Sequence, residues 1–160
     1  MGKVLRTFVN GWPGAVSRSI DDIVISARNG SGADIPFGAA VFQVAGEVTC
    51  TGFSADSSTA EKFLGFAVRA ADKTPDEYGS SQGSYAPNDP VDILVRGSMV
   101  LEFANNATPG ACVYIRKSDG KYVTAAGAEG TTLLLPNVTV RTARDGSRCA
   151  EVVVTKRNLM

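Results

Sequence analysis

Short runs of β-forming residues, separated by turn-forming residues, recur along the whole chain and constrain the fold more than any other feature. The clearest pair of runs, Cys112 to Arg116 and Lys121 to Thr124, flanks Ser118-Asp119-Gly120, and an Asp-Gly step in this position is typical of a β-hairpin. Ala39 to Val44 and Glu47 to Thr51 form a similar pair. Val, Ile and Thr together outnumber Leu and Met, which favours strands over helices. The pattern predicts about ten short strands.

Two other turn signals interrupt apolar runs. Arg96-Gly97-Ser98 separates the runs on its two sides, and Pro136-Asn137 does the same, so each is expected to be a turn between two strands. Gly65 is expected to mark a bulge or a close backbone approach. Ser58 to Glu61 has the spacing of a capping box, which would start about one helical turn. We therefore predict an all-β fold, an antiparallel sandwich, jelly roll or small barrel, with one long polar loop and little or no helix.

The length fits a single domain. A chain of 160 residues can bury roughly 70% of its unfolded surface, so no disulfide or metal ion is required. We predict an N-terminal arm at residues 1–14 and one β-rich domain at residues 15–160. Residues 72–90 form a long polar loop with a net charge of −3, and residues 91–160 carry +3. Polar stretches of this length are usually functional or disordered.

Composition excludes several classes of function. The chain has no histidine, so no Ser-His-Asp or Cys-His catalytic group can form. Sixteen basic residues balance sixteen acidic ones, which disfavours direct binding of nucleic acid. No apolar run is long enough to span a membrane, and residues 1–6 lack the apolar core of a secretory signal. We therefore expect no membrane partner and synthesis in a reducing cytoplasm.

Motifs that suggest chemistry are weak. Gly79 to Gly83 matches G-x-S-x-G, but that motif needs a flanking strand and helix and a histidine base. Asp21-Asp22 has no calcium-binding loop after it and is expected to be a solvated strand start. The three cysteines, Cys50, Cys112 and Cys149, form no C-x-x-C pair and are expected to be buried or half-buried structural thiols. We predict no catalytic residue, no cofactor and no metal site.

Residues suited to a protein interface occur in three places. Trp12 and Pro13 lie among turn formers near the chain start, where Trp12 either contacts a partner or folds back on its own domain. The polar loop holds two tyrosines, which combine apolar area with a hydrogen-bonding hydroxyl. The C-terminal part holds a basic cluster. The candidate interface residues are Trp12, Pro13, Arg18, Tyr78, Tyr85, Arg141, Arg144 and Arg148.

The order of these segments resembles a known family. The residues that carry the resemblance are Pro13-Gly14 with Ser17-Arg18, then the segments 35–41, 63–68, 85–97 and 109–115, and finally Ala150 to Val154. Each segment is a turn plus a strand, so the specific part is their order over roughly residues 12 to 155. In this order the chain resembles the cement, or head decoration, proteins of tailed-phage capsids. It departs from that pattern at Asn88, where the family usually has glycine, and in its more polar loop at residues 72–84.

The resemblance implies a non-enzymatic protein on the outside of an icosahedral phage head. It would bind as a homodimer or homotrimer and bridge neighbouring major capsid subunits, so that the mature shell is stabilised. Such a role needs a rigid core and many modest contacts repeated by symmetry. One rival is a β-sandwich glycan-binding module or a carboxylate-based glycosidase, although a single tryptophan gives it little support. Another rival is a different virion part, such as a tail or head-completion protein.

Overall fold

The structure is a computed structural model that describes residues 9–44, 48–73 and 83–158. It confirms the all-β fold class, and its helical parts are two short 3-10 turns. The strands are β1 (Val16–Asn29), β2 (Ile35–Pro36), β3 (Ala40–Gln43), β4 (Thr49–Thr51), β5 (Phe63–Ala67), β6 (Ser84–Tyr85), β7 (Pro90–Glu102), β8 (Cys112–Arg116), β9 (Tyr122–Val123), β10 (Thr132–Val140) and β11 (Cys149–Val154), and the 3-10 turns are η1 (Ala60–Lys62) and η2 (Ala71–Lys73).

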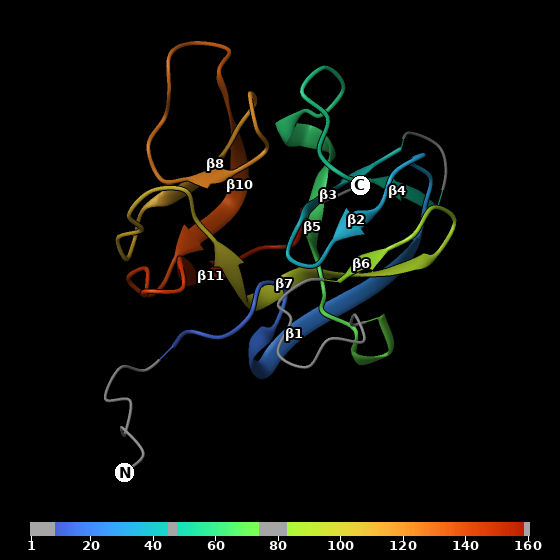
Figure 1. Cartoon of the computed structure of the whole chain (residues 1–160), viewed down its shortest axis with the longest axis horizontal. Coiled ribbons are helices and arrows are strands. Elements are labelled where there is room, and N and C mark those ends of the chain that lie inside the picture. The colour runs from blue at the N-terminus through green and yellow to red at the C-terminus, as the bar shows by residue number, and fades with distance from the viewer. Residues whose placement is uncertain (1–8, 45–47, 74–82, 159–160) are drawn as a thin grey trace.

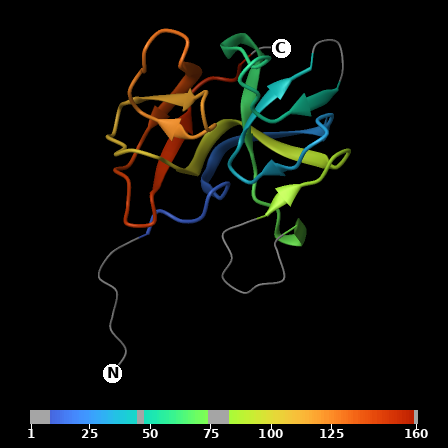
Figure 2. The ribbon, with the colours of Figure 1, turned by 45° about the horizontal axis from the view of Figure 1, so that its top comes forward.

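The strands form two lobes that share β7 (Figures 1 and 2). In the first lobe, β1, β4, β3, β5 and β7 are each hydrogen-bonded to the next, and β7 pairs with β1 again, so the ring of strands closes as in a small barrel. In the second lobe the order continues from β7 through β11, β10 and β8 to β9. A bridge between Phe103 and Tyr122 leads back from β9 to the end of β7. The pairing of β1 with β4 is parallel, and the other described strand pairs are antiparallel.

The predicted turn at Arg96-Gly97-Ser98 is wrong, because β7 continues through these residues without interruption. The first half of β7 pairs with β1 and β5, and the second half pairs with β11. Gly97 has a φ of 123°, which is a conformation that favours glycine. The glycine therefore bends a continuous strand and passes it from one lobe to the other. β1 on one side and β11 on the other are paired with this part of β7, and their hydrogen bonds keep the chain extended where the local sequence favours a turn.

The turn predicted at Pro136-Asn137 is also wrong, for a similar reason. These residues lie inside β10, where Asn137 has a φ of 61°. The register between β10 and β8 shifts between Leu134 and Thr139, so the interruption is a β-bulge. The Asn137 carbonyl accepts a hydrogen bond from the Thr155 amide at 2.9 Å, which holds the bulge against the chain after β11. The hairpin predictions at residues 112–124 and 39–51 are correct in their strand pairing.

Buried side chains form two clusters that lie on opposite faces of the same strands. One cluster fills the first lobe and includes Ile35, Val41, Leu64 and Ile93. The other includes Phe42, Phe63, Phe66, Phe103 and Tyr122 and continues into the second lobe. All five residues of β5 are buried, because both of its faces are covered. The aromatic cluster therefore lies between the lobes and fixes one against the other.

Gly65 in β5 is a close-approach glycine, as predicted. A Cβ at this position would lie 2.0 Å from the Leu94 carbonyl oxygen of the neighbouring β7. The register between β3 and β5 also shifts beside it, between Val41 and Phe42. Because backbone atoms cause the clash, the strand cannot relieve it by a side-chain rotation.

Gly65→Ala is expected to lower the free energy of unfolding by about 3 kcal/mol, because β5 and β7 must move apart. Gly32→Ala is the matched control, since nothing lies within 4 Å of the added methyl group there. The control is expected to change stability by less than about 0.5 kcal/mol. Urea unfolding of both variants measures the difference, and equal midpoints would contradict the close approach.

Candidate functional site

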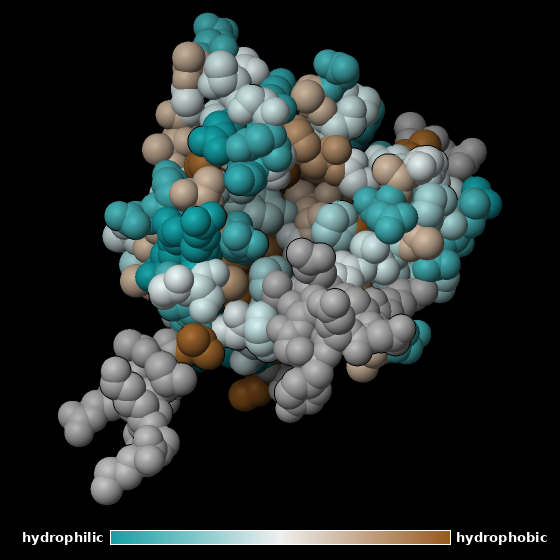
Figure 3. All heavy atoms as spheres, viewed as in Figure 1, coloured by the Kyte–Doolittle hydropathy of each residue, from teal (hydrophilic) through white to brown (hydrophobic). Residues whose placement is uncertain are grey.

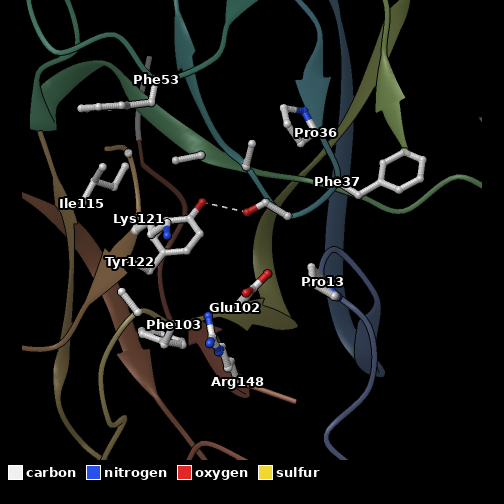
Figure 4. Close-up of a pocket in the computed structure, with 15 residues that line it drawn as sticks. Pro13, Pro36, Phe37, Phe53, Glu102, Phe103, Ile115, Lys121, Tyr122 and Arg148 are labelled. Carbon is white, nitrogen blue, oxygen red and sulfur yellow. Dashed lines mark hydrogen bonds between the residues drawn. The ribbon is translucent and has the colours of Figure 1, made fainter. Parts of the chain in front are cut away.

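A notch of about 260 Å³ opens between the two lobes, and two of the predicted interface residues line it. Pro13 comes from the N-terminal segment and Arg148 from the turn before β11. We call this hollow the interlobe notch. Its other lining residues include Pro36, Phe37, Phe53, Glu102, Phe103, Ile115, Lys121 and Tyr122 (Figure 4). Hydrophobic atoms are visible in the hollow between the lobes, whereas most of this face is hydrophilic (Figure 3).

The interlobe notch has apolar walls and a charged margin. Tyr122 is buried, and its hydroxyl donates a hydrogen bond to the Gly38 carbonyl at 2.7 Å. Burial raises the pKa of this phenol, so it is a neutral structural group. Glu102, Lys121 and Arg148 are exposed, and Glu102 and Arg148 lie near each other at one end of the notch (Figure 4). The notch is suited to an apolar side chain of a protein partner, with polar contacts around it.

Trp12 lies next to the interlobe notch and is 49% exposed. One side of its ring is covered by Arg69, whose guanidinium carbon lies 6.0 Å from the ring centroid. The same guanidinium is 5.5 Å from the Phe37 ring. A second hollow, of about 390 Å³, is lined by Trp12 and Pro13 together with Val9, Glu102 and Cys149. Trp12 is therefore packed on its own domain and still offers apolar area to a partner.

Residues 10–14 are hydrogen-bonded to the domain. The Asn10 amide donates to Asp145 Oδ2 at 2.7 Å, and the Asn10 side chain donates to the Cys149 carbonyl at 2.8 Å. The Gly14 amide donates to the Val100 carbonyl at 2.9 Å. These bonds place Trp12 and Pro13 beside the turn that carries Arg148. Residues 1–8 of the predicted arm lie outside the described residues.

Arg18 and Arg141 lie in a different place, near Glu151 of β11. Glu151 is buried, and it accepts hydrogen bonds from Ser17 Oγ at 2.9 Å and from Arg18 Nε at 2.8 Å. Burial is the largest single cause and opposes ionisation of this carboxyl group, but the hydrogen bonds from Arg18 and Ser17 and the positive charges of Arg18 and Arg141 together outweigh it and lower the pKa of Glu151 below 4.5. Arg141 is exposed, and its Nη1 lies 3.4 Å from Ser98 Oγ. Arg18 is thus engaged within the chain.

The remaining candidates are distributed differently from the prediction. Tyr85 is 1% exposed, and its hydroxyl donates to the Val68 carbonyl at 2.7 Å, so it belongs to the core of the first lobe and is not presented to a partner. Burial is the main cause that raises the pKa of Tyr85 to about 12. Tyr78 and the rest of residues 74–82 in the polar loop lie outside the described residues. Arg144 is partly buried, and its amide donates to the Ala107 carbonyl at 3.3 Å.

The cysteines differ from one another in exposure. Cys50 and Cys149 are buried, as expected, and burial raises the pKa of each thiol to about 11. Cys112 is exposed, which contradicts the expectation of a buried or half-buried thiol. It is the first residue of β8, where the alternation of the strand directs its side chain away from Val113 and the core.

Two further properties concern only the described part of the chain. No helix within residues 9–44, 48–73 or 83–158 has the length and apolar character needed to cross a membrane. Within the same ranges, no group of three or more His, Cys, Asp or Glu side chains is placed to hold a metal ion.

The fold as a whole is similar to that of a chain in a solved phage structure. A chain from the structure described as "The capsid of Myoviridae Phage XM1" has a TM-score of 0.69 and 19% sequence identity, with 96% of each chain covered. No curated protein sequence matches this chain significantly. The family model described as "Structural cement protein (E217 gp24/Pam3 gp6)" matches residues 3–155. The chain belongs to this phage cement family. It is therefore a phage structural protein, as the sequence resemblance implied.

Sequence reasoning missed Glu102, Lys121 and Arg69, which contribute to the surface around Trp12. Each is a single charged residue at or near a strand end, and such residues carry no sequence signal of their own. They are recognised only because the fold brings the end of β7, the β8–β9 hairpin and the N-terminal segment together.

The ion pair between Arg18 and Glu151 leads to a prediction about how stability depends on pH. Because the folded-state pKa lies below the ordinary value of 4.5, the carboxylate stabilises the fold above pH 4.5, and this contribution is lost as the pH falls through the folded-state pKa. Glu151→Gln is expected to be less stable than wild type at pH 7 and to lose less stability on acidification. Glu129→Gln removes the same charge at an exposed position and serves as the control. Urea midpoints between pH 3 and pH 7 measure the effect, and parallel curves for wild type and Glu151→Gln would contradict it.

Proposed function

We propose that the protein is a capsid cement protein that binds the outer surface of an icosahedral phage head. It bridges neighbouring major capsid subunits as a homodimer or homotrimer and stabilises the mature shell without a catalytic step. It is made in the cytoplasm of the bacterial host and works in the virion. Two observations carry this proposal. The cement family model matches residues 3–155, and the fold aligns with 96% of a chain from a phage capsid structure.

The surface around Trp12 is the part of the molecule that we assign to the capsid. Trp12, Pro13 and Arg148 are brought together from the two ends of the sequence, and the apolar interlobe notch lies between them. Tryptophan and arginine are the residue types most enriched at binding hot spots. The opposite charges of Glu102 and Arg148 also suit a mixed-charge partner surface better than a strongly acidic or basic one.

Cementing a shell does not require a single strong site. Each copy contributes a modest contact, and the symmetry of the head repeats this contact many times. Linked contacts give an avidity well above that of one contact. A rigid connection between the lobes is useful here. If the lobes could move relative to each other, movements of the capsid subunits would deform the cement protein, and the protein could not hold the subunits in place.

Trp12→Ala is expected to weaken capsid binding by about 2 kcal/mol, which is roughly 30-fold in the dissociation constant of one contact. The measurement is co-sedimentation of the purified protein with expanded shells that lack it. Val48→Ala is the control, since Val48 is 82% exposed and lies beside β4 in the first lobe, away from Trp12. Wild-type protein that stays in the supernatant and instead binds a glycan array would contradict the cement role, and selective binding to tails would favour another virion part.

The N-terminal arm generates a separate prediction. Deleting residues 1–14 is expected to leave a folded domain that binds shells more weakly, because Trp12 and Pro13 are removed. The lost hydrogen bonds of Asn10 and Gly14 are expected to cost about 1 kcal/mol each. Asn10→Ala is the comparison, because it loses the side-chain anchor and keeps Trp12. Circular dichroism and urea unfolding report folding, and an unfolded deletion variant would show that the segment belongs to the core.

A further inference from the structure

A bulge in β1 exposes apolar side chains that neither the cement fold nor the proposed capsid surface uses. Arg18 of β1 is opposite Ser98 of β7, and Ile23 is opposite Arg96, so five steps along β1 correspond to two along β7. The extra residues between these positions must leave the plane of the sheet. Ile20 lies in this bulge and is fully exposed, at 101%. Val24, which follows in the same strand, is 46% exposed.

One edge of this part of β1 is also open. β7 pairs with β1 along one side over most of its length. In the described part of the chain, the other side is paired only at the end of the strand, where Arg28 and Asn29 are opposite Thr49 and Cys50 of β4. An edge with free amide and carbonyl groups and exposed apolar side chains is a site for association with another chain.

A hollow of about 450 Å³ lies directly beside the Ile20 bulge, and we call it the β1 hollow. Val153 and Val154 of β11 contribute apolar atoms to its lining. Its charged lining residues are Arg18, Arg96 and Arg141 together with Asp21 and Asp22. Arg96 Nη2 and Asp21 Oδ2 are 2.6 Å apart, and Asp22 Oδ1 is buried against Gly97 without a hydrogen-bond partner. The hollow therefore offers an apolar wall and charges of both signs.

We propose that a second copy of this chain covers the β1 bulge in a two-fold symmetric contact. In such a contact the same patch is used by both copies, so a protrusion on one must fit a hollow in the same patch of the other. Ile20 supplies the protrusion, and the β1 hollow beside it supplies the receptor. Arginine and aspartate occur together around the hollow, so a two-fold axis can place an aspartate of one copy near an arginine of the other. A partner of one charge sign would meet unfavourable charges at this rim.

The inference rests on the proposed homo-oligomer and names its surface, which is separate from the capsid-binding surface around Trp12. The two surfaces share no lining residue, although both include parts of β7 and β11, and only the β1 hollow includes β1. A dimer formed through β1 would thus leave the Trp12 surface of each copy available. This arrangement is what a bridge between neighbouring capsid subunits requires.

The test is the oligomeric state of the full chain in solution, measured by sedimentation velocity over a range of concentrations. Wild type is expected to form a dimer, and Ile20→Asp is expected to raise the dissociation constant at least about 100-fold, because two isoleucines lose their burial at once. Val48→Asp, which introduces the same charge at an exposed valine of the first lobe, is expected to leave the dimer unchanged. Ile20→Asp should keep the circular dichroism spectrum of wild type, because Ile20 contributes no buried area to the single chain, and its urea midpoint should equal that of wild type only at protein concentrations where wild type is also monomeric.

Several outcomes would overturn the inference. An Ile20→Asp protein that remains a dimer excludes this surface, and a wild-type trimer excludes a two-fold contact as its basis. A wild-type monomer, with Ile20→Asp failing to co-sediment with shells, would show that the patch contacts the capsid instead. Failure of the cement role is seen separately, because wild type would then form the dimer and still not co-sediment with shells.

Discussion

The structure depends on one strand, β7, being shared by the two lobes. Its first half closes the ring of the first lobe with β1 and β5, and its second half starts the second lobe with β11. Gly97 makes the change of direction possible, since its φ of 123° favours glycine and an added Cβ would lie 2.2 Å from Asp22 Oδ1. The chain bends there without losing its ladder, so the two lobes are one hydrogen-bonded unit.

The aromatic cluster makes this junction rigid. Phe66 contacts both Phe63 and Tyr122, with ring centroids 5.3 Å and 5.8 Å apart in edge-on arrangements. Phe103 extends the same cluster at the end of β7, with its centroid 6.1 Å from that of Tyr122. Edge-on aromatic pairs contribute about 0.5–1.5 kcal/mol beyond their buried area. Because Tyr122 also donates a hydrogen bond to Gly38, the β8–β9 hairpin of the second lobe is fastened to the first lobe. The interlobe notch is the exposed end of this junction, and its shape is therefore fixed by the core.

Charge has different roles in different parts of the molecule. Zero net charge over the whole chain hides a −3 segment and a +3 segment, and this segregation is visible in the sequence. The fold then uses some of these charges internally. Arg18 and Glu151 connect β1 to β11 on the two sides of β7, so this arginine first serves the fold. Arg148 stays exposed beside the interlobe notch, where its charge is available for a partner.

The sequence alone determined the fold class, the hairpins at residues 112–124 and 39–51, the close approach at Gly65 and the cement family, because these follow from local turn chemistry, strand composition and the order of segments. It did not reveal that β7 and β10 continue through residues with strong turn signals, since that outcome depends on hydrogen bonds from neighbouring strands. It suggested Tyr85 as a contact residue, whereas the packing of the first lobe buries it. Only the tertiary structure brought Trp12 to Arg148, and only the register of β1 on β7 exposed Ile20, because local sequence carries no information on which distant strands pair or where their register slips.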